Sequence, residues 1–174
     1  MNVTTYRRPV ARPSVDLFLD ANEGARPTEA VAAALREADP GVLQRYPDTS
    51  SLEQEIAARL GIDPDRVLVT AGADDGIDRS CRVALGRGGT LLMPRPGFEM
   101  FNRYANRAGG RVLEFDWTEG DFPATQVLDL VDPETAAIAV ISPNNPTGLV
   151  ATAETVRTLA RAVPDVPVIL DAAY

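Results

Sequence analysis

The segment SPNNPTG at residues 142–148 places two asparagines between two prolines, directly after the apolar run from Ala136 to Ile141. Each proline lacks an N–H group and pushes the residue before it towards extended backbone, so we expect Ser142 and Asn145 to be extended. A plain strand-to-helix turn needs only one proline and one glycine. The segment therefore indicates either such a turn or a rigid loop that presents the Asn145 amide to a ligand.

A second polar group follows the apolar residues 166–170, where the chain reads VPVILDAAY. Asp171 ends this run, so its carboxylate should be partly desolvated and should either take up a proton or pair with a cation. A protonated ring nitrogen would be such a cation, and the phenol of Tyr174 could reach the same ligand. The structural alternative is an aspartate that caps a helix.

Two further segments place candidate ligand contacts after predicted strands. In VTAGADDGI the chain turns at Gly72 and Ala73 into a helix that starts near Asp74, and a helix N-terminus offers unpaired N–H groups to a phosphate. The two aspartates would repel an anion, so phosphate binding would have to use the main chain; a capped turn is the more common use of such a segment. In MPRPGFEMF, Phe98 could stack on a planar ring, although core packing is the more common role of an aromatic residue.

The elements that must position these residues alternate along the chain. Apolar runs predict strands at residues 66–70, 89–94, 111–117, 136–141 and 166–171, and helical patterns fall at residues 28–39, 49–61, 74–86, 97–109 and 152–163. Residues 118 onwards read as an acidic loop. Alternating strands and helices predict an α/β fold with a mainly parallel sheet covered by helices on both faces.

Composition narrows the classes of function. The net charge of −8 argues against a nucleic-acid surface, and we expect neither a signal peptide nor a membrane span. The single cysteine, Cys81, is expected to be a small buried apolar residue and fits a reducing compartment, so we expect a cytoplasmic protein. All 17 basic residues are arginines and histidine is absent, so we expect neither histidine-based catalysis nor a metal site.

Six segments in order resemble the first half of a fold-type I pyridoxal-phosphate-dependent aminotransferase of class I/II, in particular the histidinol-phosphate aminotransferase group. They are LDANEGARP, RYPD, TAGADDGI, PRPGFEMF, SPNNPTG and VILDAAY, spread from about residue 19 to residue 174. The resemblance implies an incomplete cofactor-binding large domain at residues 46–174, a three-layer sheet with helices on both faces. Residues 1–45 would form an N-terminal arm and part of the small domain.

The resemblance also implies which residues hold the cofactor, pyridoxal 5'-phosphate. Asn145 and Tyr174 would both bind its phenolic oxygen, with the Asn145–Pro146 bond in the cis form. Asp171 would pair with the pyridine nitrogen and keep it protonated, and Phe98 would stack on the ring.

The remaining implied contacts involve the phosphate, a second subunit and the substrate. Backbone N–H groups of Ala73 and Asp74 would hold the phosphate. Tyr46 would reach the phosphate of the neighbouring subunit's cofactor, which implies a homodimer with shared sites. Asn22 and Glu23 lie in a segment that borders the substrate in this family, and their roles stay open.

The implied activity moves an amino group between an amino acid or amino-phosphate substrate, such as histidinol phosphate, and a 2-oxo acid. The family's Schiff-base lysine normally lies a few tens of residues beyond the Asp-x-x-Tyr motif, and this chain contains no lysine. We therefore expect no catalytic residue within it and no activity from it alone, as in the N-terminal part of a longer enzyme. Alternatives are a decarboxylase of a phosphorylated amino acid or an aromatic aminotransferase on the same fold, and, in another class, a non-catalytic binding domain derived from the family.

Overall fold

The computed structural model describes residues 26–174, and the chain divides into two compact units at residues 1–47 and 48–174. The first unit contains α1 (Glu29–Glu37) and the 3-10 helix η1 (Pro40–Gln44). Thr28 begins α1 by accepting a hydrogen bond from the N–H of Val31, and Asp39 begins η1 by accepting from that of Gly41. Neither helix has a buried residue.

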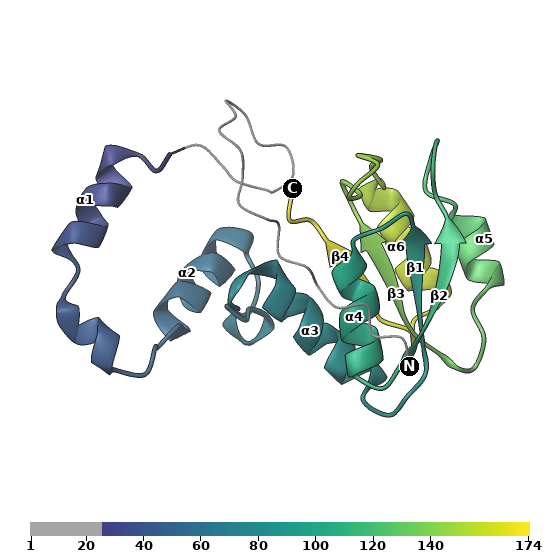
Figure 1. The fold of residues 1–174 in the computed structure, drawn as a ribbon, viewed down its shortest axis with the longest axis horizontal. Helices are drawn as coiled ribbons and strands as arrows, with labels where there is room; N and C mark the ends of the chain where they lie inside the picture. The colour runs from purple at the N-terminus through teal and green to yellow at the C-terminus, as the bar shows by residue number, and fades with distance from the viewer. Residues whose placement is uncertain (1–25) are drawn as a thin grey trace, which may run out of the picture. The chain divides into compact units, whose positions relative to one another are not determined.

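The second unit is a parallel α/β sheet, which confirms the predicted fold class (Figure 1). The described strands are in the order β2-β1-β3-β4, and each neighbouring pair is parallel. The elements in chain order are α2 (Ser50–Leu60), η2 (Pro64–Arg66), α3 (Gly72–Leu85), β1 (Thr90–Arg95), α4 (Glu99–Arg107), β2 (Arg111–Asp116), α5 (Ala124–Asp129), β3 (Thr135–Ile141), α6 (Ala153–Ala162) and β4 (Val168–Asp171).

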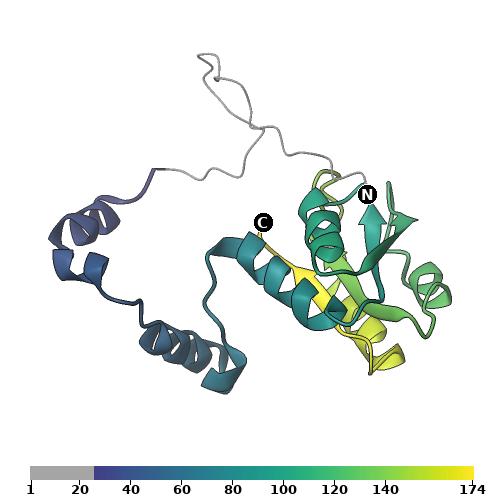
Figure 2. The same cartoon turned by 60° about the horizontal axis from the view of Figure 1, so that its bottom comes forward.

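Helices cover both faces of this sheet, with α3 and α4 on one side and α5 and α6 on the other (Figures 1 and 2). Successive side chains of a strand point to opposite faces, so β1 and β3 contribute alternate residues to two separate cores. In β1, Leu91 and Met93 pack with α3 and α4, whereas Leu92 packs with α5 and α6. The helices fill the first core with Ile77, Cys81, Leu85, Phe101 and Ala105, and the second with Val127 and Leu159.

The structure differs from the predicted elements in two places. Residues 67–70 are not a strand, because no segment among residues 26–174 completes a ladder with them; the N–H of Val69 donates instead to the carboxylate of Glu53 at 2.9 Å. The segment predicted as an acidic loop contains the short helix α5, whose Val127 is fully buried in the second core.

Cys81 is fully buried in the first core, as predicted. Burial, helped by the negative charge of Asp78, raises the pKa of its thiol to about 11, so the thiol is protonated at neutral pH. Within residues 26–174, no helix is long and apolar enough to cross a lipid bilayer.

Candidate functional site

The candidate site lies at the carboxyl edge of the parallel sheet, where open α/β sheets bind their ligands. Ile141 at the end of β3 is paired with Asp171 at the end of β4. The N–H of Ser142 then donates to the carbonyl of Asp171 at 2.9 Å, which ties the start of the loop after β3 to the end of β4. The structure thereby brings together the two segments SPNNPTG and VILDAAY.

Asn145 and Tyr174 lie in contact at this edge, although they are 29 residues apart in sequence. The side-chain nitrogen of Asn145 donates to the phenol oxygen of Tyr174 at 3.3 Å. The Asn145 amide keeps a second N–H and Tyr174 keeps its O–H, so the pair can still donate to an acceptor oxygen. The Asn145–Pro146 bond is cis, as the resemblance implies.

The loop after β3 is closed by hydrogen bonds of its own. The Ser142 hydroxyl accepts from the N–H of Ala151 at 2.9 Å and donates to the Ala151 carbonyl at 3.2 Å. The main-chain N–H of Asn144 donates to Leu149, and its carbonyl accepts from Gly148, both at 2.7 Å. These bonds fix the backbone that carries Asn145, which supports a rigid loop rather than a generic turn.

Asp171 is half-buried, as its place at the end of an apolar strand predicts. Its Oδ1 accepts from the N–H of Ala173 at 3.1 Å. No hydrogen bond within residues 26–174 engages Oδ2. One carboxylate oxygen is therefore available to a cationic group in the site.

The first turn of α3 leaves two main-chain N–H groups open. The N–H of Ala71 donates to Oδ2 of Asp75 at 3.1 Å, and that of Gly72 donates to the carbonyl of Thr70 at 2.8 Å. The N–H groups of Ala73 and Asp74, which follow, have no hydrogen-bond partner among residues 26–174. These are the two groups that the resemblance assigns to a phosphate.

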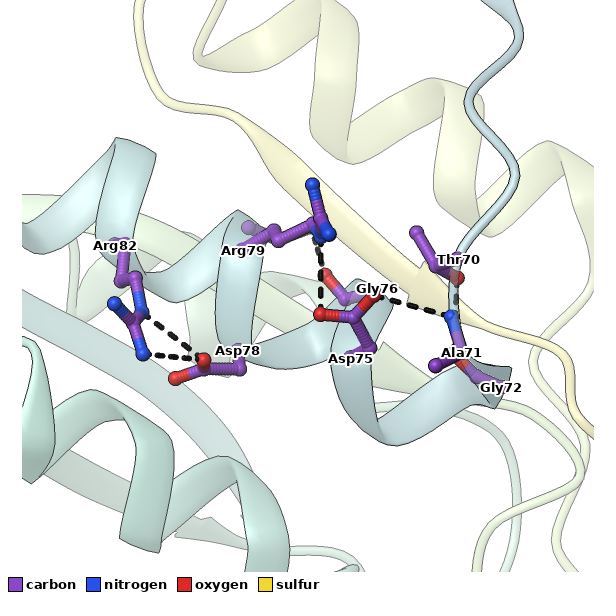
Figure 3. A network of polar contacts seen from close by, with 9 residues as sticks. Thr70, Ala71, Gly72, Asp75, Gly76, Asp78, Arg79 and Arg82 are labelled. Atoms are coloured by element: carbon purple, nitrogen blue, oxygen red, sulfur yellow. Dashed lines mark hydrogen bonds and ion pairs between the residues drawn. The ribbon is translucent and has the colours of Figure 1, made fainter. Parts of the chain in front are cut away.

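The acidic side chains near this turn have partners within the protein. Arg79 donates to Oδ1 of Asp75 at 3.0 Å, and this bond, followed by that from Ala71, lowers the pKa of the Asp75 carboxyl (Figure 3). One turn later, Arg82 pairs with Asp78 at 2.7 Å (Figure 3). The Asp75 charge that would repel an anion at the helix N-terminus is therefore balanced by an arginine.

Asp74, the other acidic residue of the first turn, lies near the phenol of Tyr104 on α4. Burial is the main cause that raises the pKa of Tyr104, and the negative charges of Asp74 and Asp78 add to it. Phosphate binding at this turn would use the main chain, as the sequence predicts.

A cavity of about 400 Å³ connects the first turn of α3 with the end of β4. Its volume is within the range of small-molecule sites. Its walls are formed by Ala73, Gly76, Ile77 and Ser80 from α3 and by residues 169–173 from β4 and the segment after it. Ala73 and Asp171, which the resemblance assigns to opposite ends of one cofactor, thus line the same cavity.

Four of the predicted positions are less closely tied to this cavity. Phe98 is half-buried and packs against the first core, so its ring stacking stays a prediction. Tyr46 belongs to the first unit and its side chain is fully exposed, and its contact with a second subunit also stays a prediction. Asn22 and Glu23 lie outside the described residues.

Sequence reasoning passed over Asn144, which the structure places at the centre of the loop after β3. Its side chain is only 2% exposed, and its amide nitrogen reaches the carbonyl of Pro96 in the loop after β1 at 2.9 Å. The repeated asparagine in SPNNPTG was the available signal.

Known proteins resemble this chain in sequence and in fold. The histidinol-phosphate aminotransferase of Granulibacter bethesdensis is 34% identical over 161 residues, covering 90% of this chain and 43% of its own length. That of Sphingopyxis alaskensis is 34% identical over 167 residues, covering 94% of this chain and 45% of its own length. The crystal structure of histidinol-phosphate aminotransferase from Sinorhizobium meliloti in complex with pyridoxal-5'-phosphate matches with a TM-score of 0.75 at 28% identity, over 85% of this chain and 41% of that one.

The chain spans less than half the length of these curated relatives, which are matched over 43% and 45% of their residues. The family model described as aminotransferase class I and II matches residues 15–174, which is most of the sequence and includes every element of the second unit. The fold, the polar residues gathered at the carboxyl edge of the sheet and this match agree: the chain belongs to the class I and II aminotransferase family.

Proposed function

We propose that the whole protein is a pyridoxal-phosphate-dependent aminotransferase of the histidinol-phosphate aminotransferase type. It moves an amino group between an amino acid or amino phosphate, such as histidinol phosphate, and a 2-oxo acid. Membership of the class I and II aminotransferase family supports the reaction class, and the names of the 34% identical relatives support the substrate. Residues 1–45 would be the N-terminal arm with part of the small domain, and residues 46–174 would be the incomplete cofactor-binding large domain.

The observation that carries the proposal is the contact between Asn145 and Tyr174 beside the end of β4. A paired amide and phenol suit a phenolic oxygen, which accepts hydrogen bonds. The half-buried carboxylate of Asp171 suits a protonated pyridine nitrogen, and the open N–H groups of Ala73 and Asp74 suit a phosphate. The donors and acceptors present in this chain therefore fit pyridoxal 5'-phosphate.

Pyridoxal phosphate, when bound, supplies an electron sink for the negative charge that develops at the substrate's α-carbon. Asp171 holds a proton on the ring nitrogen, because an adjacent carboxylate favours the charged form of that nitrogen. Asn145 and Tyr174 would orient the ring through its phenolic oxygen, and Phe98 would cover one ring face. The first turn of α3 holds the phosphate through main-chain N–H groups.

The covalent lysine and the group that grips the substrate's carboxylate belong to the remaining half of the protein in this proposal. The chain has 17 basic residues, all of them arginines. Tyr46 would complete the site of a second subunit, so the active form would be a homodimer. The lone buried Cys81 fits the cytoplasm.

Intact mass of the natural protein after borohydride reduction tests the proposal. We expect a mass well above 18.6 kDa that includes a reduced pyridoxal-phosphate adduct. A mass of 18.6 kDa without an adduct would contradict the proposal and would support the non-catalytic binding domain. A screen of histidinol phosphate, aromatic amino acids and phosphorylated amino acids, with product analysis, then separates this transamination from aromatic transamination and from decarboxylation.

A further inference from the structure

Asn144 and Asn145 are neighbours in the loop after β3, but their side chains have different environments. Asn145 is partly exposed and contacts Tyr174 in the candidate site. Asn144 is 2% exposed and makes no contact that the proposed cofactor would need. Its role must therefore come from what its buried amide binds.

The Asn144 amide nitrogen joins two loops that are far apart in sequence. It donates to the carbonyl of Pro96, 48 residues earlier in the loop between β1 and α4, at 2.9 Å. It also donates to the hydroxyl of Thr147, in its own loop, at 2.8 Å. A carbonyl can only accept, and both amide hydrogens are used, so neither an aspartate nor an apolar residue could replace this amide.

Each of these two contacts lies two residues from a residue assigned to the cofactor ring. Pro96 precedes Phe98, and Thr147 follows Asn145. Only glycine fits at the next position of the first loop, since a Cβ atom at Gly97 would lie 2.4 Å from the carbonyl of Pro94 and 3.4 Å from the side chain of Ile141. The Asn144 bonds therefore fix the position of one ring contact relative to the other.

The oxygen of the same amide indicates that packing alone does not explain Asn144. Oδ1 is buried and has no hydrogen-bond partner among residues 26–174. A buried acceptor without a partner costs free energy that an apolar side chain of similar size would avoid. An amide at this place is understandable if its nitrogen performs a task that an apolar residue cannot perform.

We propose that Asn144 is a positioning residue, which holds Phe98 and Asn145 at a fixed separation so that one ring can be stacked and bound through its oxygen at the same time. The identity of that ring rests on the proposed function. The fixed separation does not, because it follows from the two hydrogen bonds of the Asn144 nitrogen.

The test uses Asn144→Asp in the natural protein, since aspartate keeps the shape but replaces the donor by an acceptor that faces the Pro96 carbonyl. Hydrogen exchange of residues 97–101 without cofactor is the first measurement, and we expect it to be at least tenfold faster in the variant. Asn106→Asp, in an exposed amide contact with Asn102 on α4, is the matched control and should leave this exchange within twofold. Unchanged exchange in Asn144→Asp would overturn the proposal whatever the protein binds.

The second measurement compares the affinities for pyridoxal 5'-phosphate and for its 3-deoxy analogue, which lacks the phenolic oxygen. We expect Asn144→Asp to reduce the preference for pyridoxal 5'-phosphate at least fivefold, because Asn145 no longer meets that oxygen. An equal loss of both affinities would mean a merely structural role and would overturn the proposal. If the unaltered protein binds neither compound, the proposed function fails, and the exchange result alone decides whether Asn144 links the loops.

Thr147→Val keeps the volume and removes one acceptor of the Asn144 amide. It should change both measurements in the same direction by a smaller factor, and Thr147→Ser, which restores the hydroxyl, should return them to the values of the unaltered protein. These variants decide the question if Asn144→Asp does not fold.

Discussion

The loop after β3 and the segment after β4 leave neighbouring strands at paired residues, yet they are held in different ways. The loop is closed by the bonds of Ser142 to Ala151 and by those of Asn144. Residues 172–174 are exposed, and the bonds that hold this segment run to the Asp171 carboxylate and to the Asn145 amide. Among residues 26–174, the loop after β3 is thus fixed by contacts of its own, while the hydrogen bonds of residues 172–174 that involve side chains run to Asp171 and Asn145.

The largest effect is expected at Asp171, the last residue of β4, from which the exposed segment 172–174 leaves the sheet. Asp171→Asn keeps an acceptor for the N–H of Ala173 but removes the charge that would keep the ring nitrogen protonated. In the whole protein we expect the turnover number for transamination to fall by about 10²–10³-fold, the usual loss when a preorganised electrostatic group is removed. Steady-state kinetics with histidinol phosphate measure the turnover number, and a thermal melt checks that the variant is folded. A turnover number within threefold of the original would contradict the role of Asp171.

The next largest effect concerns the contribution of the closing hydrogen bonds of the loop after β3 to the stability of the protein. Ser142→Ala removes both hydrogen bonds to Ala151, and we expect the free energy of unfolding to fall by about 1–2 kcal/mol. Ser80→Ala is the matched control, because the Ser80 hydroxyl donates only to the Gly76 carbonyl in its own helix, and its loss should be below about 0.5 kcal/mol. Urea unfolding compares the two; equal losses would mean that the loop does not need its closing bonds.

Tyr174→Phe tests how the loop after β3 and the segment after β4 depend on each other, because it removes the side-chain bond between Tyr174 and Asn145. Tyr174 is 61% exposed and its bond to Asn145 is 3.3 Å long, so we expect the free energy of unfolding to change by less than about 0.5 kcal/mol. The affinity for pyridoxal 5'-phosphate should fall about three- to tenfold, as for one lost hydrogen bond. A spectrophotometric titration measures it. Pyridoxal without its phosphate should lose the same factor, and a loss confined to the phosphorylated compound would argue against the phenolic-oxygen contact.

The smallest expected effect concerns the phosphate end of the cavity. Arg79→Gln leaves the Asp75 charge unbalanced beside the open N–H groups, and we expect about a two- to threefold loss of pyridoxal 5'-phosphate affinity, the size of an exposed ion pair. Pyridoxal should bind as before. Arg82→Gln, which breaks the next ion pair of α3, serves as the control. Adding Asp75→Asn to Arg79→Gln should restore the affinity, and a double variant as weak as the single one would exclude the charge effect.

The fold could be predicted where a pattern depends on local sequence alone. The unbroken apolar run of β3 is buried on both faces and becomes the strand between β1 and β4, as the pattern indicates. The expected strand at residues 66–70 failed for a non-local reason, since an extended segment becomes a strand only when another segment pairs with it. Helix α5 was missed because its six residues are too few to show a helical period, and Val127 is buried only through the sheet beneath it.

The contacts of the candidate site that could be predicted are likewise those that depend on a motif or on regular secondary structure. Asn145 and Tyr174 could be named from their motifs, and their contact follows from the parallel pairing of β3 with β4. The Asp75–Arg79 pair has the four-residue spacing of helical ion pairs, so it was visible in the sequence once the helix was placed. The bond between Asn144 and Pro96 was not visible, because it joins two irregular loops whose approach depends on the pairing of β1 with β3 in the sheet.

The two cores on opposite sides of the sheet also determine which substitutions can compensate for one another among related sequences. A change of side-chain volume at Cys81 can be compensated by residues packed with α3 and α4. A change of volume at Leu159 can be compensated only by residues packed with α5 and α6. Adjacent positions of a strand then belong to different covarying groups: Leu91 should change together with Cys81, and Leu92 together with Leu159. Successive residues of one strand would therefore alternate between two groups of positions that evolve independently of each other.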